Sequence, residues 1–390
     1  IIEPDLNNKG FNDQENLSQD SKNIMAGVYS VVKSVDYFGD TVVVKFCRDK
    51  MMIFTGKDYA HFILNSAIVD SVINFKGYWK KTNSYDRSYD TEITVPGDIT
   101  NRLIITGEKP AEIKLSGYFS KNCCDTVYFE FKFSREILAD QDEFHIVAHK
   151  GGGNNNTCFD APENSIEILS ISEYYGAEAV EVDVQLTKDK VPVVFHDLNF
   201  SHATVNTDFI LGPVSSFYFE HIRNLASLKN GEKIPTAEEI FDYILYHTEL
   251  KFVWMDIKTG ETVPEIVGIQ KKYNDLAKQT GRDLAIFMGI PSDEIYNELI
   301  KLEDYRSIPT LCELSKGKAK EIGAKYWAPR WTLGTLENDI EEMKNAGIES
   351  IFWTVNDDDA MDIILDKSGA AGILTDYPAI LSYKHYVRTN

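Results

Sequence analysis

Short runs in which apolar and polar residues alternate dominate the N-terminal part of the chain. Between about Met25 and Phe133 these runs, separated by Gly, Asn and Asp turns, predict about eight β-strands and no helix. The strands are expected at residues 41–46, 50–54, 60–64, 72–79, 90–95, 101–105, 111–115 and 126–133. This pattern predicts an all-β module, either a small antiparallel barrel or a sandwich.

Tyr and Phe are frequent in these strands, and the outline of the module is similar to a lipocalin. Such side chains either line a cup for a glycan or lipid ligand or fill a core. We favour the core, because aromatic residues in strands usually pack against one another.

The alternation stops and the charge density rises at residues 134–143, which we interpret as a domain boundary. Strand-like and helix-like patterns then follow one another, as in a parallel sheet covered by helices. This part of the chain contains nine candidate strands, which end at about residues 149, 185, 196, 257, 288, 311, 329, 355 and 375. An α/β (TIM) barrel needs eight strands, and we expect residues 325–329 to be the extra one.

Composition narrows the class of protein. The 390 residues are 43% hydrophobic, enough for two well-filled cores, and the net charge of -21 disfavours nucleic acid or an anionic membrane face as a partner. The five cysteines have no metal-type spacing, and the adjacent Cys123 and Cys124 are expected to be strand filler. No apolar run reaches transmembrane length.

Residues 1–23 are polar and rich in Asn and Asp, the composition of a flexible tether. A tether of this kind fits an exported protein of the periplasm or cell surface, including a lipoprotein with its lipid anchor upstream of residue 1. The expected organisation is therefore a tether at 1–23, a β-rich domain at 24–140 and a TIM-barrel domain at 141–390.

Three strand candidates of the barrel end in ionisable residues, where barrels of this class carry their chemistry. On the second of them, Glu181 and Asp183 are two residues apart and therefore point the same way. Two inward carboxylates repel each other unless a cation lies between them, and oxygen ligands favour Ca²⁺ or Mg²⁺ over zinc. The alternative is a structural ion pair with a barrel lysine. Asp256 and Lys258 also share one face of a strand, and they either serve a site or simply pair with each other.

Several separated segments of the second domain resemble the glycerophosphodiester phosphodiesterase family, TIM barrels related to the phosphatidylinositol-specific phospholipases C. The resemblance spans about residues 144–381 and leaves out the β-rich domain. It rests on His149–Gly151, Pro162–Ser165, Glu181–Val184, Leu186–Asp189, Phe195–Asp197, Lys233–Thr236, Asp256–Lys258, Trp353–Asn356 and Gly372–Pro378.

The resemblance implies His149 and His196 as the acid and base. It also implies the metal ligands Glu181, Asp183 and Asp256, with Lys150 and Lys258 as phosphate contacts. Imidazole suits both proton transfers because its unperturbed pKa, about 6.5, lies near neutral pH. The nucleophile is either a glycerol hydroxyl, which gives a cyclic phosphate, or water. Trp353 is either a wall for the substrate or barrel filling.

The chain departs from the family pattern at four places. Lys150 replaces an arginine, and Asp256 replaces a longer glutamate. A polar segment at residues 151–157 is inserted beside the first histidine, as either a lid or a plain loop, and His202 aligns with a usual arginine. These changes suggest an altered substrate, since both histidines and both strand carboxylates remain.

The sequence therefore predicts metal-dependent hydrolysis of a glycerophosphodiester, or a related phosphodiester, to an alcohol and glycerol phosphate. The alternatives are a catalytically impaired barrel that binds a glycan or lipid, and a phospholipase-type enzyme that acts on intact lipid. Metal-dependent turnover separates the first from the second, and activity on soluble against micellar substrates separates it from the third.

Overall fold

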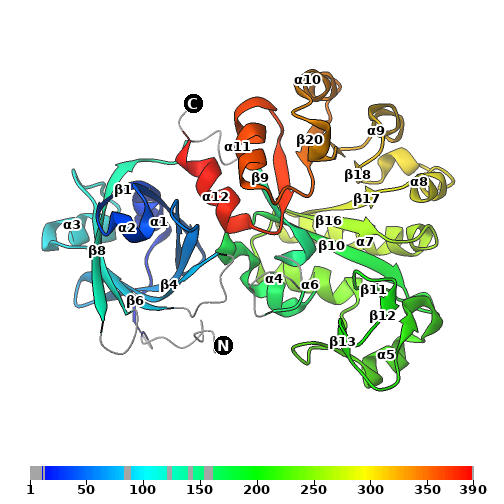
Figure 1. The fold of residues 1–390 in the computed structure, drawn as a ribbon, viewed down its shortest axis with the longest axis horizontal. Helices are drawn as coiled ribbons and strands as arrows, with labels where there is room; N and C mark the ends of the chain where they lie inside the picture. The colour runs from blue at the N-terminus through cyan, green and yellow to red at the C-terminus, as the bar shows by residue number, and fades with distance from the viewer. Residues whose placement is uncertain are drawn as a thin grey trace. The chain divides into compact units, whose positions relative to one another are not determined.

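The computed structural model describes residues 11, 14–82, 89–120, 125–138, 144–152 and 161–388. The chain divides into two compact units (Figure 1). The first contains residues 1–143, 174–176 and 379–390, and the second contains residues 144–173 and 177–378. The predicted domains differ from these units chiefly at the C-terminus, because nearly all of helix α12 (Pro378–Val387) lies in the first unit.

The first unit is a closed antiparallel barrel in which each strand pairs with its neighbours in sequence and β8 pairs with β1. This confirms the expected antiparallel all-β architecture, whereas the lipocalin outline stays a prediction. Its strands are β1 (Gly27–Lys33), β2 (Thr41–Cys47), β3 (Lys50–Thr55), β4 (Ala60–Val69), β5 (Val72–Lys81), β6 (Tyr89–Thr94), β7 (Lys114–Ser120) and β8 (Thr126–Arg135).

In the described residues, two helices lie between strands of this barrel, contrary to the all-strand prediction, and a third precedes β1. They are α1 (Gln19–Met25), α2 (Val35–Phe38) and α3 (Asp98–Ile105). The strand expected at 101–105 is part of α3, where the buried Asn101 and Ile104 are three residues apart, as helical periodicity requires. Asn101 also accepts a hydrogen bond from the Ile73 N–H at 2.7 Å and donates to the Val95 carbonyl at 2.6 Å. These buried polar contacts override the local preference of the Ile-rich segment for a strand.

The tether prediction is wrong for the described residues from Gln14 to Asn23, and residues 1–10, 12 and 13 lie outside the described part. Glu15 forms a β-bridge with Ile68, and Leu17 is buried. Ser18 caps α1 by accepting a hydrogen bond from the Ser21 N–H at 3.1 Å. The polar composition of this segment gave no indication that it is ordered. A few apolar side chains and one helix cap are enough to hold it in place.

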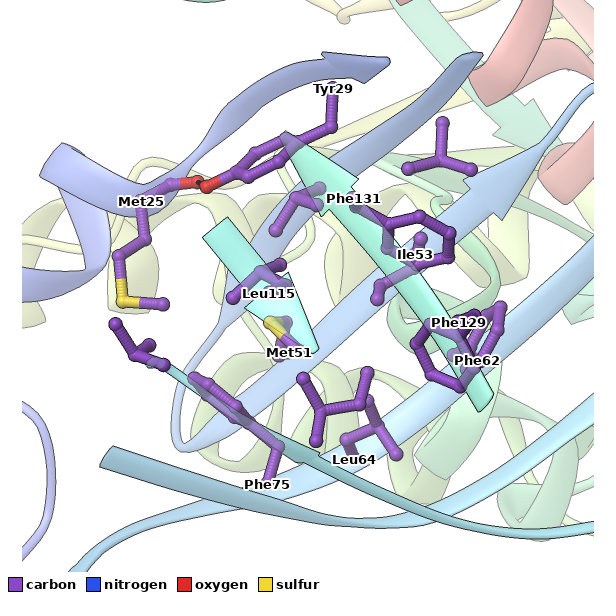
Figure 2. Packing of buried hydrophobic residues seen from close by; sticks show 14 of the residues in the cluster. Met25, Tyr29, Met51, Ile53, Phe62, Leu64, Phe75, Leu115, Phe129 and Phe131 are labelled. Atoms are coloured by element: carbon purple, nitrogen blue, oxygen red, sulfur yellow. Dashed lines mark hydrogen bonds between the residues drawn. The ribbon is translucent and has the colours of Figure 1, made fainter. Parts of the chain in front are cut away.

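Aromatic rings fill the interior of the first barrel (Figure 2). Phe38 is fully buried, and its ring lies within 5.3–5.7 Å of five other rings. Those rings belong to Phe62, Trp79, Phe119, Phe129 and Phe131. This packing agrees with the interpretation of these residues as core.

Replacing Phe38 by alanine is therefore expected to lower the free energy of unfolding by about 3–5 kcal/mol, because it removes buried contacts and leaves a cavity. Chemical denaturation, followed by tryptophan fluorescence, measures the change. Tyr118, which is 53% exposed, is the matched control, and Tyr118→Ala should change the stability little. A small loss for Phe38→Ala would mean that the barrel interior tolerates empty space, as a ligand cup would.

The second unit is a closed barrel of eight parallel strands, which confirms the predicted TIM barrel. Its strands are β9 (His145–Ala148), β10 (Ala179–Leu186), β16 (Phe252–Ile257), β17 (Ala285–Ile290), β18 (Thr310–Cys312), β19 (Tyr326–Trp327), β20 (Glu349–Phe352) and β21 (Gly372–Thr375). Its α-helices are α4 (Ile166–Ser172), α5 (Phe219–Leu225), α6 (Ala237–His247), α7 (Thr262–Thr280), α8 (Asp293–Leu299), α9 (Lys316–Ile322), α10 (Glu337–Asn345) and α11 (Asp358–Lys367). Short strand pairs, β12 (Asn199–Phe200) with β14 (Gly212–Pro213) and β13 (Val205–Asn206) with β15 (Ser227–Leu228), lie between β11 (Pro192–Val194) and α6 in the chain.

The prediction of the extra strand is wrong. Residues 326–327 form barrel strand β19, and the ninth strand is β11 (Pro192–Val194), which pairs antiparallel with β10. A tight turn, in which the Lys190 N–H donates to the Thr187 carbonyl at 3.0 Å, joins β10 to β11. Such a short connection can only join antiparallel strands, because a parallel pair needs a long crossover.

Strand alternation sets which side chains face the inside of this barrel. The interior cluster includes Val147, Ala179, Trp254, Leu311, Ile351 and Leu374. Because side chains two apart share a face, the next inward residues toward the carboxyl ends are His149, Glu181, Asp256, Glu313, Trp353 and Asp376. Ionisable and aromatic side chains therefore lie at the carboxyl ends of the strands, next to the apolar cluster of the barrel interior.

Cys47 and Cys312 are buried, while Cys123, Cys124 and Cys158 lie outside the described residues, so the strand-filler prediction is untested. Within the described ranges, none of the helices has the length and apolar character needed to cross a membrane.

Candidate active site

Three of the predicted site residues meet at the carboxyl ends of β10 and β16. Oxygen atoms of Glu181, Asp183 and Asp256 lie within 4.8 Å of one another. The two strands are parallel, and their register places Asp183 beside Asp256. Glu181 is 2% exposed and Asp183 is 1% exposed, so these two carboxylates are shielded from water.

Lys258 lies between two of these carboxylates. Its Nζ is 2.6 Å from Asp183 Oδ1 and 2.5 Å from Asp256 Oδ2. Burial alone would lower the pKa of Lys258, but Asp183, Asp256 and Glu181 together raise it above its usual value. Lys258 is therefore a fixed positive charge at the centre of the acidic group.

Lys258 does not provide a hydrogen-bond partner for every carboxylate oxygen of the acidic group. Glu181 Oε1 and Asp256 Oδ1 are buried and have no hydrogen-bond partner among the described residues. Burial, and then the charges of Asp183 and Asp256, raise the pKa of Glu181. Unpartnered buried carboxylate oxygens of this kind fit a hard divalent cation, for which oxygen is the preferred ligand. The acidic group therefore fits the predicted divalent metal.

Asn164 supports Asp183 from the loop before α4. Its Nδ2 donates to Asp183 Oδ2 at 2.6 Å, and its Oδ1 accepts from the Asp183 N–H at 3.1 Å. Asn164 has a φ of 60° and is 1% exposed. Asparagine tolerates this left-handed backbone better than most residues, which suits it to the position.

His149 lies immediately after β9, beside the acidic group. Its Nε2 is 3.9 Å from Glu181 Oε2, and its Nδ1 is 2.6 Å from Asp376 Oδ1. Asp376 is 2% exposed and follows β21, the strand next to β9. Asn356 holds Asp376 in turn, donating from Nδ2 to Asp376 Oδ2 at 2.6 Å and accepting from the Asp376 N–H at 2.8 Å.

His196 follows the antiparallel strand β11, which brings it to the same end of the barrel. Its Nδ1 is 2.8 Å from Asp197 Oδ1, and 38% of its side chain is exposed. The Gln185 Nε2 donates to the carbonyls of Phe195 and Asp197 at 2.7 and 2.8 Å, which fixes the backbone on both sides of the histidine. Burial raises the pKa of Asp183, but Lys258 and, to a smaller extent, the nearby His196 lower it below its usual value.

The ammonium of Lys150 is paired outside the acidic group. Its Nζ forms an ion pair with Glu163 at 3.4 Å, and it is 7% exposed. Its backbone N–H, set by a left-handed φ of 53°, donates to Glu181 Oε2 at 2.8 Å. In this arrangement the contact of Lys150 with the acidic group is through its backbone, while its ammonium is engaged elsewhere.

Trp353 borders the site at the carboxyl end of β20. It packs on the interior apolar cluster, and its Nε1 donates to the Ala328 carbonyl at 2.7 Å. The Arg330 guanidinium lies over its ring, 4.9 Å from the centroid. Trp353 thus fills part of the barrel interior, and the positive charge of Arg330 lies against its ring.

Sequence reasoning did not assign Asn164, Asn356, Asp376 or Glu313 to the site. Asn164, Asn356 and Asp376 fall inside segments that carried the family resemblance, and strand alternation from Leu374 would have placed Asp376 inward. Glu313 follows β18, and burial, together with the charge of Asp256, raises its pKa well above the usual range. The same alternation from Leu311 points to it.

Comparison with known proteins identifies a family that matches the second unit. The model of the glycerophosphoryl diester phosphodiesterase family matches residues 149–380, more than half of the chain. A glycerophosphodiester phosphodiesterase of Caldanaerobacter subterraneus subsp. tengcongensis is 28% identical over 245 residues, covering 60% of this chain and 95% of the relative. The YhdW protein of Bacillus subtilis (strain 168) is 28% identical over 253 residues, with the same coverages of 60% and 95%.

A related fold is also present among solved structures. A protein of Silicibacter pomeroyi DSS-3, described as a glycerophosphoryl diester phosphodiesterase, superimposes with a TM-score of 0.50 at 20% identity and covers 61% of this chain and 92% of its own. At that identity the likeness supports the fold. The match of the family model over more than half of the chain shows that the chain belongs to the glycerophosphoryl diester phosphodiesterase family, whose members are phosphoric diester hydrolases.

Proposed function

We propose that this chain hydrolyses glycerophosphodiesters to an alcohol and glycerol phosphate, with a divalent metal and a histidine pair at the carboxyl end of the second barrel. The observation that carries the proposal is the meeting of Glu181, Asp183 and Asp256 within 4.8 Å, with His149 3.9 Å from Glu181. Family membership makes a phosphodiester the appropriate substrate class.

In this proposal Glu181, Asp183 and Asp256 hold the metal, either Ca²⁺ or Mg²⁺. When bound, a divalent cation polarises the phosphoryl oxygens and offsets negative charge in the transition state. Lys258 contributes a second positive charge from a fixed position, 2.6 Å from Asp183 and 2.5 Å from Asp256. The arrangement is preorganised, so little reorganisation is needed as charge develops.

His149 and His196 carry the proton transfers in the proposal. The contact of His149 Nδ1 with Asp376 at 2.6 Å favours the tautomer with its proton on Nδ1, which leaves Nε2 free to take a proton. His196 is half-exposed and held by Asp197, so it can exchange a proton with the alcohol and then with water.

The substrate contacts are also proposals. Lys258 lies where it can meet a phosphate oxygen, and Trp353 offers a wall for the rest of the substrate. A phosphate role for Lys150 would require its Nζ to leave Glu163, from which it is 3.4 Å away. We rank Lys258 above Lys150 as the phosphate contact because Lys258 Nζ already lies among the proposed metal ligands, whereas Lys150 Nζ pairs with Glu163 outside that group.

Phosphorus NMR of the reaction with soluble glycerophosphodiesters tests the proposed reaction and its nucleophile together. Release of glycerol phosphate alone supports attack by water, whereas transient cyclic glycerol phosphate supports attack by the neighbouring hydroxyl. Absence of any phosphorus-containing product, with metal present, would contradict the proposal and favour the binding-protein alternative.

Three further expectations remain proposals. The exported location, the lipid anchor and a glycan or lipid ligand of the first barrel can be tested by cell fractionation, mass spectrometry of the native protein and ligand binding. Activity on micellar lipid compared with soluble diesters tests the phospholipase alternative.

A further inference from the structure

Two asparagines hold two aspartates of the site by the same arrangement. Asn164 donates to the carboxylate of Asp183 at 2.6 Å and accepts from the backbone N–H of the same residue at 3.1 Å. Asn356 donates to the carboxylate of Asp376 at 2.6 Å and accepts from its backbone N–H at 2.8 Å. Each amide thus fixes both the side chain and the backbone of one aspartate.

The two aspartates serve different halves of the site. Asp183 belongs to the acidic group with Glu181 and Asp256, whose oxygens lie within 4.8 Å of one another. Asp376 contacts the Nδ1 of His149 at 2.6 Å and is not part of that group. A change at one asparagine should therefore reach the metal ligands, and a change at the other should reach the histidine.

An amide that donates to a carboxylate also restricts its rotation. With Asn164 in place, Asp183 Oδ2 accepts the amide proton while Oδ1 faces Lys258 Nζ at 2.6 Å. With Asn356 in place, Asp376 Oδ2 accepts from the amide while Oδ1 faces His149. In both cases the asparagine decides which oxygen is directed into the site.

We propose that Asn164 and Asn356 are positioning residues that act independently, Asn164 on the metal-binding half through Asp183 and Asn356 on the tautomer and orientation of His149 through Asp376. This inference rests on the proposed function for the roles of the two halves. Neither asparagine contacts the reacting atoms in this assignment. Residues that hydrogen-bond to a metal ligand or to a catalytic group, without touching the metal or the substrate, typically change metal affinity or activity by about 10–100-fold when they are removed.

The Asn164→Gly variant tests the metal-binding half. Glycine removes the amide but keeps the left-handed backbone, whose φ is 60° in the native chain. Calorimetric titration of the metal-free protein with Mg²⁺ and Ca²⁺ should show about 10–100-fold weaker binding. The ¹⁵N chemical shifts of the His149 ring should stay as in the wild type.

The Asn356→Ala variant tests the histidine half. Its metal affinity should equal that of the wild type, while kcat falls about 10–100-fold with little change in KM. The ¹⁵N shifts of His149 should move toward a mixture of tautomers. Asn356→Gln, which keeps an amide, should recover part of the lost kcat.

Asn274 provides a matched control in the same barrel. It donates to the Ile286 carbonyl at 3.1 Å and accepts from the Ile286 N–H at 2.8 Å, so it holds a backbone by the same pair of atoms at the start of β17. Asn274→Ala should lower stability, but it should leave metal affinity, kcat and the His149 shifts unchanged.

The inference is overturned if Asn164→Gly and Asn356→Ala change the same property, or if both behave like Asn274→Ala. The proposed function can fail separately, because absence of turnover in the wild type would leave calorimetry and NMR able to test both asparagines. Weaker metal binding in one variant and altered His149 shifts in the other would then still support the two separate roles.

Discussion

The His149→Ala variant is expected to lower kcat for glycerophosphodiester hydrolysis by about 10²–10⁴-fold, the usual contribution of a general acid or base. The imidazole has its Nε2 3.9 Å from Glu181 and its Nδ1 2.6 Å from Asp376, so it lies at the acidic group in a fixed orientation. Alanine removes the proton carrier but none of the carboxylates. Initial rates at saturating metal measure the loss.

Calorimetry on the same variant separates catalysis from metal binding. We expect metal affinity to change little, because the three carboxylates remain. His247→Ala is the control, since His247 is exposed at the end of α6, and it should keep wild-type rates. A wild-type kcat for His149→Ala would exclude His149 from the chemistry, and loss of metal binding would instead make it a ligand.

The Asp183→Asn variant is expected to have the largest effect on metal binding. Asp183 is 1% exposed, belongs to the three-carboxylate group and is 2.6 Å from Lys258. The neutral amide removes one of the negative charges that offset both the cation and the lysine. Metal affinity should fall by more than the 10–100-fold typical of residues that only hydrogen-bond to a metal ligand, and turnover should fall with it.

Titration calorimetry of the metal-free variant measures this loss, and raising the metal concentration should recover part of the turnover. Asp304→Asn is the matched control, because Asp304 is exposed and precedes a short helical turn after α8. Unchanged metal affinity in Asp183→Asn would contradict the assignment of the acidic group as the metal site.

Strand alternation predicted which carboxylates share a face, whereas the two histidines and the roles of the site residues came from the family resemblance. Glu181 and Asp183 are two apart in a strand rich in valine, so their common direction did not depend on long-range contacts. Asp256 and Lys258 obey the same rule, and the structure adds that Lys258 contacts both Asp256 and Asp183. The barrel itself followed from the succession of strand and helix patterns.

The parts that could not be predicted depend on contacts distant in sequence. Periodicity could not show that residues 192–194 form an antiparallel strand, since that depends on the tight turn after β10. The helix at Asp98–Ile105 needs the hydrogen bonds of Asn101 to β5 and to the segment before α3. The pairing of Lys150 with Glu163 and of His149 with Asp376 likewise joins segments whose approach only the closed barrel determines.

The most direct test of metal-dependent hydrolysis at this site combines two titrations of one metal-free sample. Turnover of a soluble glycerophosphodiester and calorimetric binding are both measured as Mg²⁺ or Ca²⁺ is added. The account predicts no turnover without the ion and half-maximal turnover at the concentration that half-fills one site, with both curves shifted in Asp183→Asn. Full turnover in protein that binds no ion would contradict it.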